Sequence, residues 1–275
     1  MNKDETRDLV LIKYGGNAML DEELTSRIIE TVSDLKQSGY KLVIVHGGGP
    51  FIEDNLKLAG IESEFIGGHR RTSADAMKYI EMALKGHVNS KLVKEFNRKG
   101  MKAVGLSGKD GAMVKVNKRY IASDQGKKID LGYVGDVDSI ETDLLELLLH
   151  HNYTPVISTI ASGKDGDDYN VNADMFAGHL AGALQVKYMI MLTDVDGLMK
   201  DPDNPESLIH ELKITEIGKL KGSTIKGGMI PKTEACQIAV EGGAESALIM
   251  NGTKPETIRL FFNQDPKAKF TTIKE

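Results

Sequence analysis

The sequence lacks several features that define well-known classes of protein. Its single cysteine, Cys236, cannot form an intramolecular disulfide, which favours a reducing compartment such as the cytoplasm. The longest apolar runs, such as 188–192, are far shorter than the roughly 20 residues that cross a bilayer. No signal-peptide apolar segment precedes the first strand-like run. We therefore expect a cytoplasmic protein without a membrane partner.

The sequence also has fewer basic than acidic residues and lacks the standard nucleotide-binding motifs. The 35 basic residues are outnumbered by 40 acidic ones, and the net charge of −5 disfavours a general nucleic-acid binder. No G-x-x-x-x-G-K-[ST] motif occurs, and the glycines of 46–50 do not have G-x-G-x-x-G spacing. Neither HExxH nor a paired-cysteine motif is present. A P-loop, a dinucleotide site and a zinc site are therefore not expected.

What the sequence contains is an alternation of short apolar runs with longer helical patterns. Strand-like runs lie at 9–13, 41–46, 101–107, 155–159, 188–193, 246–251 and 270–273. Helices are expected over 21–37, 51–58, 73–97, 141–152, 173–184, 231–240 and 255–262, and short strands and turns over 115–137. This alternation predicts an α/β protein with a mainly parallel sheet covered on both faces. At 275 residues, one domain or two lobes are both allowed, and we expect a boundary near residue 184.

Glycine is the residue in excess, with 29 copies, about a tenth of the chain against a usual ~7%. Three clusters follow strand-like runs, at 15–16, 47–49 and 194–197. Ligands of open parallel sheets bind at the carboxyl ends of the strands, and glycine lets main-chain N–H groups approach an anion closely. Each cluster alone could be a tight turn, but three at one sheet edge favour an anion site.

Charged residues at the same edge favour phosphoryl transfer. Lys13 ends a strand-like run, and Asp174 and Lys232 begin helices. Arg70 could hold a carboxylate in a bidentate fork. Taken singly, each is more often a surface charge, and the helix dipole alone would explain an aspartate at 174. Together with glycine amides they form the set that phosphoryl transfer needs. His46 has no histidine partner nearby, so we expect it to be structural.

Eight motifs in series then resemble the amino acid kinase family. They are KYGGNAM at 13–19, HGGGP at 46–50, GHRRT at 68–72, GKD at 108–110, GYVG at 132–135, NVNAD at 170–174, LTDVDG at 192–197 and GGMIPK at 227–232. The resemblance implies an open three-layer αβα sandwich with a mainly parallel sheet of eight strands. It further implies that residues 1–184 bind an acyl amino acid and dimerise, and that residues 185–275 bind ATP.

The resemblance also implies an activity and a set of site residues. The activity is ATP-dependent phosphorylation of the γ-carboxylate of N-acetyl-L-glutamate, in arginine biosynthesis. Lys13 and Lys232 would act on the transferred group, with Asp174 orienting them. The implied acyl amino acid contacts are Gly48, Gly49, Arg70 and Asn170. The implied nucleotide contacts are Gly15, Gly16, Asp194, Asp196, Gly197, Met199 and Gly228. The cofactors would be ATP and Mg²⁺, with the metal held mainly by the phosphates and no protein metal site.

Two other functions stay open. The acceptor could be a relative such as N-acetyl-α-aminoadipate, because discriminating one methylene is worth only ~1–3 kcal/mol. A catalytically silent homologue could instead sense a ligand, although such a protein would not need Lys13, Asp174 and Lys232. Few residues precede the first strand, where the arginine-inhibited branch of the family carries an additional helix, so we expect a homodimer.

Some residues depart from the family pattern or have plain explanations. Arg71 stands where the family usually has an apolar residue, and we expect it to point to solvent. The acidic run 165–168 is expected to be a solvated loop, and Cys236 to be packed in a helix. Lys109 and Asp110 could contact a ligand or stabilise a turn.

Overall fold

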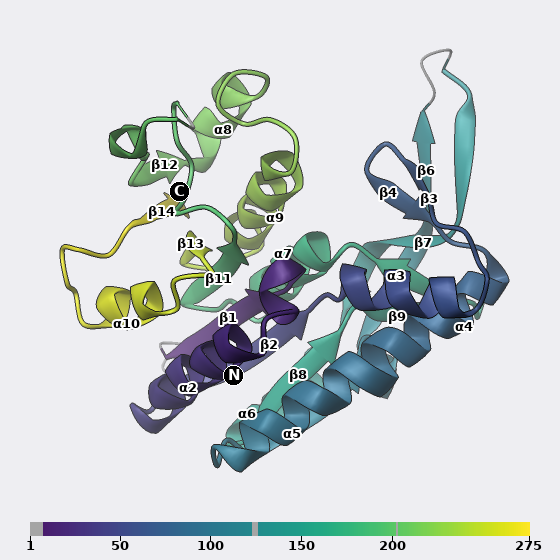
Figure 1. Cartoon of the computed structure of the whole chain (residues 1–275), viewed down its shortest axis with the longest axis horizontal. Coiled ribbons are helices and arrows are strands. Elements are labelled where there is room, and N and C mark those ends of the chain that lie inside the picture. The colour runs from purple at the N-terminus through teal and green to yellow at the C-terminus, as the bar shows by residue number, and fades with distance from the viewer. Residues whose placement is uncertain (1–7, 123–125, 202) are drawn as a thin grey trace.

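An eight-stranded sheet runs through the middle of the molecule (Figure 1). The computed structural model describes residues 8–122, 126–201 and 203–275. The strands lie in the order β12-β14-β13-β11-β1-β2-β8-β5. Their bounds are Leu9–Tyr14 (β1), Lys41–His46 (β2), Ala103–Ser107 (β5), Thr154–Ser158 (β8), Tyr188–Thr193 (β11), Glu211–Lys213 (β12), Ser246–Asn251 (β13) and Phe270–Lys274 (β14). The six neighbouring strands from β13 to β5 are parallel, whereas β14 pairs antiparallel with β13 and parallel with β12.

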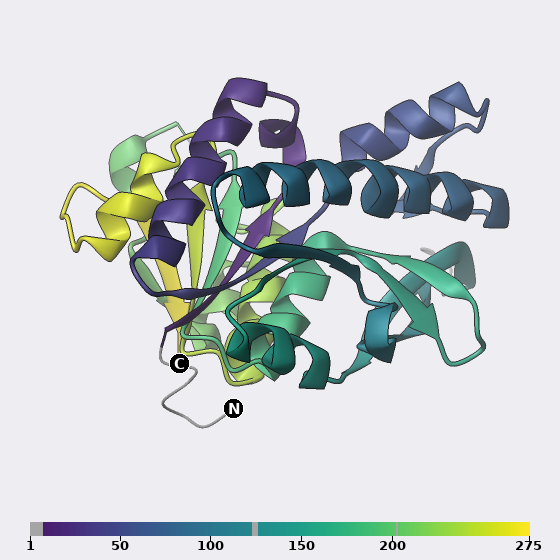
Figure 2. The ribbon, with the colours of Figure 1, turned by 90° about the horizontal axis from the view of Figure 1, so that it is seen from below.

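Helices cover both faces of this sheet, as Figure 2 shows. One layer contains α2 (Glu22–Gln37), α5 (Ser90–Arg98) and α10 (Glu256–Phe262). The opposite layer contains α6 (Asp143–His150), α7 (Ala173–Ala183) and α9 (Met229–Glu241). Within β1, Leu9 and Leu11 join the core beneath α7 while Val10 and Ile12 join the core beneath α2, because successive side chains of a strand point to opposite faces. The predicted α/β sandwich is confirmed.

The long helix predicted over 73–97 is present, but it contains a π-helical segment. It consists of α4 (Ala74–Glu81), the π-helical segment Met82–Asn89 and then α5, without a break. Ser73 caps its start by accepting a hydrogen bond from the Ala76 N–H at 3.1 Å. Before it comes α3 (Gly49–Leu58), which starts within the second glycine cluster. The apolar spacing of the sequence did not distinguish the π-helical turns from α-helix.

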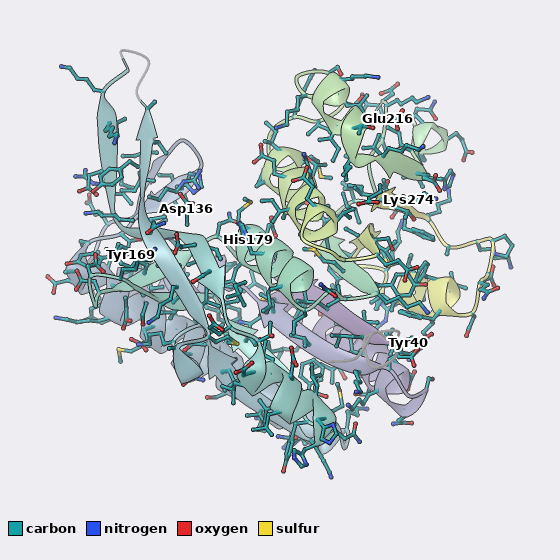
Figure 3. All side chains as sticks on the ribbon, turned by 180° about the vertical axis from the view of Figure 1, so that it is seen from behind. Tyr40, Asp136, Tyr169, His179, Glu216 and Lys274 are labelled. Carbon is teal, nitrogen blue, oxygen red and sulfur yellow. The ribbon has the colours of Figure 1, made fainter. Side chains whose placement is uncertain are left out.

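A small closed barrel and a hairpin flank the sheet on the β5 side. The barrel contains β6 (Val114–Ala122), β7 (Lys128–Ile140), β9 (Ile160–Gly163) and β10 (Asp168–Val171), and the hairpin contains β3 (Glu64–Ile66) and β4 (His69–Arg71). Figure 3 labels Tyr169 of the barrel and Lys274 of β14 on opposite sides of the molecule. The prediction of only short strands and turns over 115–137 was wrong. The β6–β7 pairing is long but has two register shifts, which interrupt the alternation that marks a strand.

Other differences from the prediction are small. The elements β3, β4, β12 and α8 (Ile214–Leu220), all of which are short, were not predicted from the sequence. Helix α9 begins at Met229, two residues before the expected start at Pro231, and the proline lies in the first turn, where its missing N–H leaves no helical hydrogen bond unmade. Within the described parts of the chain, no helix has both the length and the apolar character that crossing a bilayer requires.

Candidate active site

Three cavities lie near the carboxyl ends of the central strands. The first, of about 220 Å³, is lined by Gly47–Gly49, the β4 residue Arg70 and the β10 residue Asn170. The second, of about 210 Å³, is lined by Lys13, the 15–16 glycine pair, Asp194 and Lys232. The third, of about 610 Å³, is lined by the loop 194–201 and by parts of the segments 223–229 and 251–254. We call them the acyl cavity, the central cavity and the nucleotide cavity.

Asp174 holds two lysines at the central cavity. Its Oδ1 lies 2.6 Å from the Lys13 Nζ, and its Oδ2 lies 3.0 Å from the Lys232 Nζ. Lys13 and Asp174 are almost fully buried, with 7% and 6% of their surface exposed. Lys13 lies in β1, Asp174 in the first turn of α7 and Lys232 in the first turn of α9. Three elements far apart in the sequence therefore bring two cations and one anion together.

The close packing of α7 on α9 produces this arrangement. A Cβ atom at Gly178 of α7 would lie 2.4 Å from the Ala235 carbonyl oxygen of α9, and one at Gly182 would lie 2.9 Å from the Gly242 Cα. Only glycine permits so close an approach of two helix backbones. At the start of α7, the Asn172 side chain accepts hydrogen bonds from the N–H groups of Asp174 and Met175, at 2.9 and 3.1 Å. The first turns of both helices are thereby fixed beside each other.

The electrostatics of this cluster keep Asp174 ionised. Burial on its own would raise the pKa of Asp174, but the positive charges of Lys13 and Lys232 more than offset it, so the pKa lies below its ordinary value. Among the described residues no donor makes a hydrogen bond of regular geometry to its Oδ1, so the contact with Lys13 is an ion pair. Both ammonium groups line the central cavity, where a bound anion would meet them.

The central cavity is completed by the first glycine turn. A Cβ atom at Gly15 would lie 3.3 Å from the Lys13 Nζ, so the glycine leaves room for the ammonium group, and Gly16 has a φ of +76°. Tyr14 fixes this turn, because its hydroxyl group lies 2.9 Å from the Thr25 hydroxyl and donates to the Ala18 carbonyl at 3.1 Å. Burial raises the pKa of Tyr14 to about 12, so the phenol stays protonated. This role of Tyr14 was not predicted from the sequence.

The acyl cavity contains all four residues that the resemblance implied for it, namely Gly48, Gly49, Arg70 and Asn170. The Arg70 Nη1 donates to the Glu53 Oε2 at 2.6 Å and to the Ser63 hydroxyl, and the guanidinium lies 4.6 Å from the Phe65 ring centre. Both hydrogen bonds come from Nη1, so Nε and Nη2 are available to a bound carboxylate within the described structure. Glu53 and Ser63 were not anticipated from the sequence.

The nucleotide cavity contains Asp194, Asp196, Gly197 and Met199, as the resemblance implied. Gly197 has a φ of +155°, and a Cβ atom there would lie 2.5 Å from the Thr271 Oγ1, so this loop can lie against β14 only with glycine. Six other residues of its lining carry a cationic, amide or hydroxyl group and were not anticipated from the sequence: Lys200, Ser223, Thr224, Lys226, Asn251 and Lys254.

Asp196 is tied to two of these neighbours, which take up most of its hydrogen-bond accepting capacity. Its Oδ1 accepts from the Asn251 amide at 2.7 Å, and Lys254 Nζ lies 2.8 and 2.9 Å from its two oxygens. Burial opposes the charge of Asp196, but Lys254 and Asn251 outweigh that effect and lower its pKa. A signal for Asn251 did exist, because Asn251-Gly252 ends a strand at the same sheet edge.

Gly228 is the one implied nucleotide contact that lines none of the three cavities. It lines a separate cavity of about 350 Å³ together with Gly68, Arg119, Asn172 and Ile230. Its assignment to the nucleotide therefore stays a prediction that the cavities do not support. No group of three or more His, Cys, Asp or Glu side chains in the described residues could hold a metal ion.

The remaining predictions concern residues outside the three cavities. Arg71 is exposed and pairs with Glu64 at 3.1 Å, as expected of a residue that points to solvent. Asp110 accepts from the Ser107 N–H at 2.6 Å and so stabilises a turn. Lys109 pairs with Glu81 and Asp168, each at 2.7 Å, so the acidic run 165–168 is not wholly a solvated loop. Cys236 is fully buried, and burial raises the pKa of its thiol.

Comparison with known proteins gives one consistent family. The model of the amino acid kinase family matches residues 8–251. An acetylglutamate kinase of Methanococcus aeolicus is 44% identical, over 91% of this chain and 87% of that protein. An acetylglutamate kinase of Agrobacterium fabrum is also 44% identical, over 94% and 89%. Among solved structures, smu.665 from Streptococcus mutans has a TM-score of 0.76 at 26% identity, over 98% and 99%. The chain belongs to the amino acid kinase family.

Proposed function

We propose that this protein transfers the γ-phosphoryl group of ATP to the γ-carboxylate of N-acetyl-L-glutamate, yielding N-acetyl-L-glutamyl 5-phosphate and ADP in arginine biosynthesis. The observation that carries the proposal is the Lys13–Asp174–Lys232 cluster at the central cavity, between a cavity suited to a small carboxylate and a larger one suited to a nucleotide. The acetylglutamate kinases that are 44% identical over nine-tenths of the chain support it.

The proposed reaction needs no general base. The γ-carboxylate is ionised at neutral pH, so one of its oxygens attacks the γ-phosphorus while the bond to the β-phosphate oxygen breaks and ADP leaves with the electron pair. The barrier is the approach of two anions. Lys13 and Lys232 place two positive charges where negative charge accumulates, and Asp174 holds both ammonium groups in position before the reactants arrive.

The substrates have clear places in this scheme. Arg70 would bind the α-carboxylate through Nε and Nη2, while Asn170 and the amides of Gly48 and Gly49 would contact the rest of the acyl amino acid. The glycine pair 15–16 would meet the phosphates.

ATP would occupy the nucleotide cavity along the loop from Asp194 to Met199, with its phosphates in the central cavity. Asp194 lines both cavities, so it lies where the nucleoside and the phosphates of a bound ATP would meet. Mg²⁺ would be held mainly by the ATP phosphates, as this cation usually is, and would neutralise their charge.

The two halves of the sheet suggest a division of labour. The ends of β2 and β8, which precede residue 184, lead into the lining of the acyl cavity, and the ends of β11 and β13 lead into the lining of the nucleotide cavity. We propose that 1–184 forms the acyl-binding and dimerising lobe and 185–275 the ATP-binding lobe. We further propose that the protein works in the cytoplasm as a homodimer, which a mass measurement in solution would test.

A hydroxamate assay separates this function from its two rivals. The purified protein is incubated with ATP, Mg²⁺, hydroxylamine and either N-acetyl-L-glutamate or N-acetyl-α-aminoadipate. Hydroxamate from acetylglutamate, at a higher kcat/KM than from the longer acid, is the expected result. Preference for aminoadipate would replace the acceptor, and no acyl phosphate from either would favour a ligand sensor.

A further inference from the structure

Two buried polar side chains, His46 and Asn89, form a hydrogen-bonded pair directly behind the acyl cavity. His46 ends β2 and is fully buried, and Asn89 ends the π-helical segment and is 2% exposed. Their side chains meet at 2.9 Å, between the Asn89 Nδ2 and the His46 Nε2. The other ring nitrogen, Nδ1, lies 2.8 Å from the Gly47 carbonyl oxygen. The chemistry proposed above gives neither side chain a role.

The partners of Asn89 determine where the imidazole carries its proton. The Asn89 Nδ2 also lies 2.8 Å from the Val156 carbonyl oxygen, which can only accept, so this atom is the amide nitrogen. The His46 Nε2 must then accept, and the proton resides on Nδ1, which donates to the Gly47 carbonyl. Burial lowers the pKa of His46 to about 4, partly countered by the hydrogen bond to Gly47, while the charge of Lys85 lowers it further. The ring is therefore neutral at physiological pH, with a single tautomer.

This hydrogen bond fixes the peptide group between Gly47 and Gly48. All described peptide bonds are trans, so the Gly47 C=O and the Gly48 N–H point in opposite directions. Because His46 holds the carbonyl towards the core, the Gly48 N–H points away from it, on the side where Gly48 lines the acyl cavity. The preceding peptide is fixed as well, since the Gly47 N–H donates to the Tyr14 carbonyl at 3.1 Å. Within the described structure, no acceptor takes the Gly48 N–H.

The π-helical segment and the neighbouring strand β5 allow the Asn89 side chain to reach His46. The π-helical segment places Leu84 on the wall of the acyl cavity and Asn89 at its own end, where it reaches His46. A Cβ atom at Gly105 of β5 would lie 2.2 Å from the Asn89 Oδ1, so the strand accommodates the amide only because residue 105 is glycine. π-Helical turns are energetically unfavourable and are found frequently at functional sites.

We propose that Asn89, acting through the Nδ1–H tautomer of His46, is a positioning residue that aims the Gly48 amide at the acceptor carboxylate. The inference rests on the proposed function, because the amide has an anion to meet only when an acyl amino acid occupies the acyl cavity. Asn89 holds the ring through Nε2 and favours the same tautomer as the Gly47 carbonyl does, His46 turns the peptide, and the peptide presents its N–H. Misdirecting an oriented donor lowers the rate of the chemical step more than it lowers nucleotide affinity.

The test compares substitutions that keep or remove the donor to the Gly47 carbonyl. His46→Leu removes this donor, Asn89→Leu removes the donor that holds the Nε2 side of the ring, and His46→Asn keeps an N–H close to the position of Nδ1. We expect the two leucine variants to lose about 10- to 100-fold in kcat, with KM for ATP within about twofold of wild type. His46→Asn should recover kcat to within about threefold, because it preserves the one hydrogen bond that matters.

Asn97 provides a matched control on the same continuous helix. Its side chain donates to the Ala103 carbonyl at 3.1 Å and accepts from the Ala103 N–H at 2.6 Å, so it also joins this helix to β5 but far from the glycine loop. Asn97→Leu should lower the thermal stability and leave kcat of the folded protein unchanged. Equal losses of kcat in Asn97→Leu and Asn89→Leu would show that Asn89 is only structural and would overturn the proposal. Equal losses of kcat in His46→Leu and His46→Asn would overturn it as well.

A spectroscopic measurement keeps the inference independent of the substrate assignment. The ¹⁵N shifts of the His46 ring report the tautomer in the full-length protein without turnover. We expect a protonated Nδ1 in wild type and a shifted Nε2 resonance in Asn89→Leu, because that nitrogen loses its hydrogen-bond donor. A protonated Nε2 in wild type would overturn the positioning proposal even if acetylglutamate is the substrate. If wild type shows the expected tautomer but does not phosphorylate acetylglutamate, the proposed acceptor is wrong and the positioning proposal still stands. The kcat comparison would then be made with the acceptor that wild type does use.

Discussion

Replacing Asp174 by asparagine should destabilise the protein strongly, although aspartate and asparagine side chains are nearly the same size. The substitution leaves two ammonium groups without their shared counter-ion. Lys232 has 20% of its side chain exposed and can regain water, but Lys13 is only 8% exposed and cannot. Breaking a buried ion pair by removing one partner costs about 3–5 kcal/mol, and the partial rehydration of Lys232 favours the lower end. Against a total stability of roughly 5–15 kcal/mol, this is a large loss.

The loss should depend on pH in a defined direction. Because the pKa of Asp174 is lower in the folded protein than in the unfolded chain, its charge stabilises the folded state at neutral pH. That contribution is complete above the unfolded pKa of about 3.9 and disappears as the pH falls through the lower folded value. The difference in unfolding free energy between wild type and Asp174→Asn should therefore be constant from pH 7 to pH 5 and narrow below about pH 4.

Denaturant unfolding followed by circular dichroism measures this difference. Asp168→Asn is the matched control, because Asp168 also pairs with a lysine, at 2.7 Å from Lys109, but is one-third exposed. A partly exposed pair contributes about 0–1 kcal/mol, so the control should be close to wild type. The reasoning about the buried cluster is refuted if the unfolding free energy of Asp174→Asn is within about 1 kcal/mol of the wild-type value at pH 7. It is also refuted if the difference between the two free energies does not become smaller below about pH 4.

Four further substitutions test other parts of the site. Lys13→Ala and Lys232→Ala should each lower kcat by about 10²–10³ while the protein stays folded, and steady-state kinetics showing wild-type-like turnover by both would remove their proposed roles. Arg70→Lys should raise KM for acetylglutamate about tenfold and leave KM for ATP unchanged, because lysine cannot form a bidentate fork; an equal rise in both constants would contradict this. Gly178→Ala should cost about 1–3 kcal/mol in thermal unfolding and also lower kcat, because its Cβ would collide with the Ala235 carbonyl, and an unchanged variant would exclude close helix packing as the cause of the cluster.

The strand and helix pattern of the sheet could be predicted because it reflects periodicity and turn residues alone. Continuous apolar runs such as 9–13 and 188–193 became adjacent parallel strands, and the glycine clusters that follow them lie at the expected edge. The convergence of Lys13 and Lys232 could also be anticipated, since the carboxyl ends of parallel strands and the first turns of the following helices meet at one edge. These features depend on local sequence and on general rules of topology.

Contacts made by tertiary packing could not be predicted in this way. The sequence does not show that Arg70 pairs with Glu53, because their pairing depends on how the β3–β4 hairpin folds over α3. Similarly, Asp196 was assigned to the nucleotide, but its oxygens are engaged by Asn251 and Lys254, which come from the end of β13. His46 was correctly expected to be structural in its contacts, yet its partner Asn89 lies 43 residues away and nothing local indicates it.

The distance between the two lysines is set by helix packing rather than by the motifs that contain them. Gly178 and Gly182 look unfavourable in the sequence, because glycine within a helix costs roughly 1 kcal/mol relative to alanine. The structure supplies the compensating reason: both glycines contact the backbone of α9, which carries Lys232 in its first turn. Asp174 therefore reaches Lys232 because residues one and two turns further along α7 have no side chain. A substitution that touches neither substrate nor lysine can then alter the reaction, which the Gly178→Ala variant examines directly.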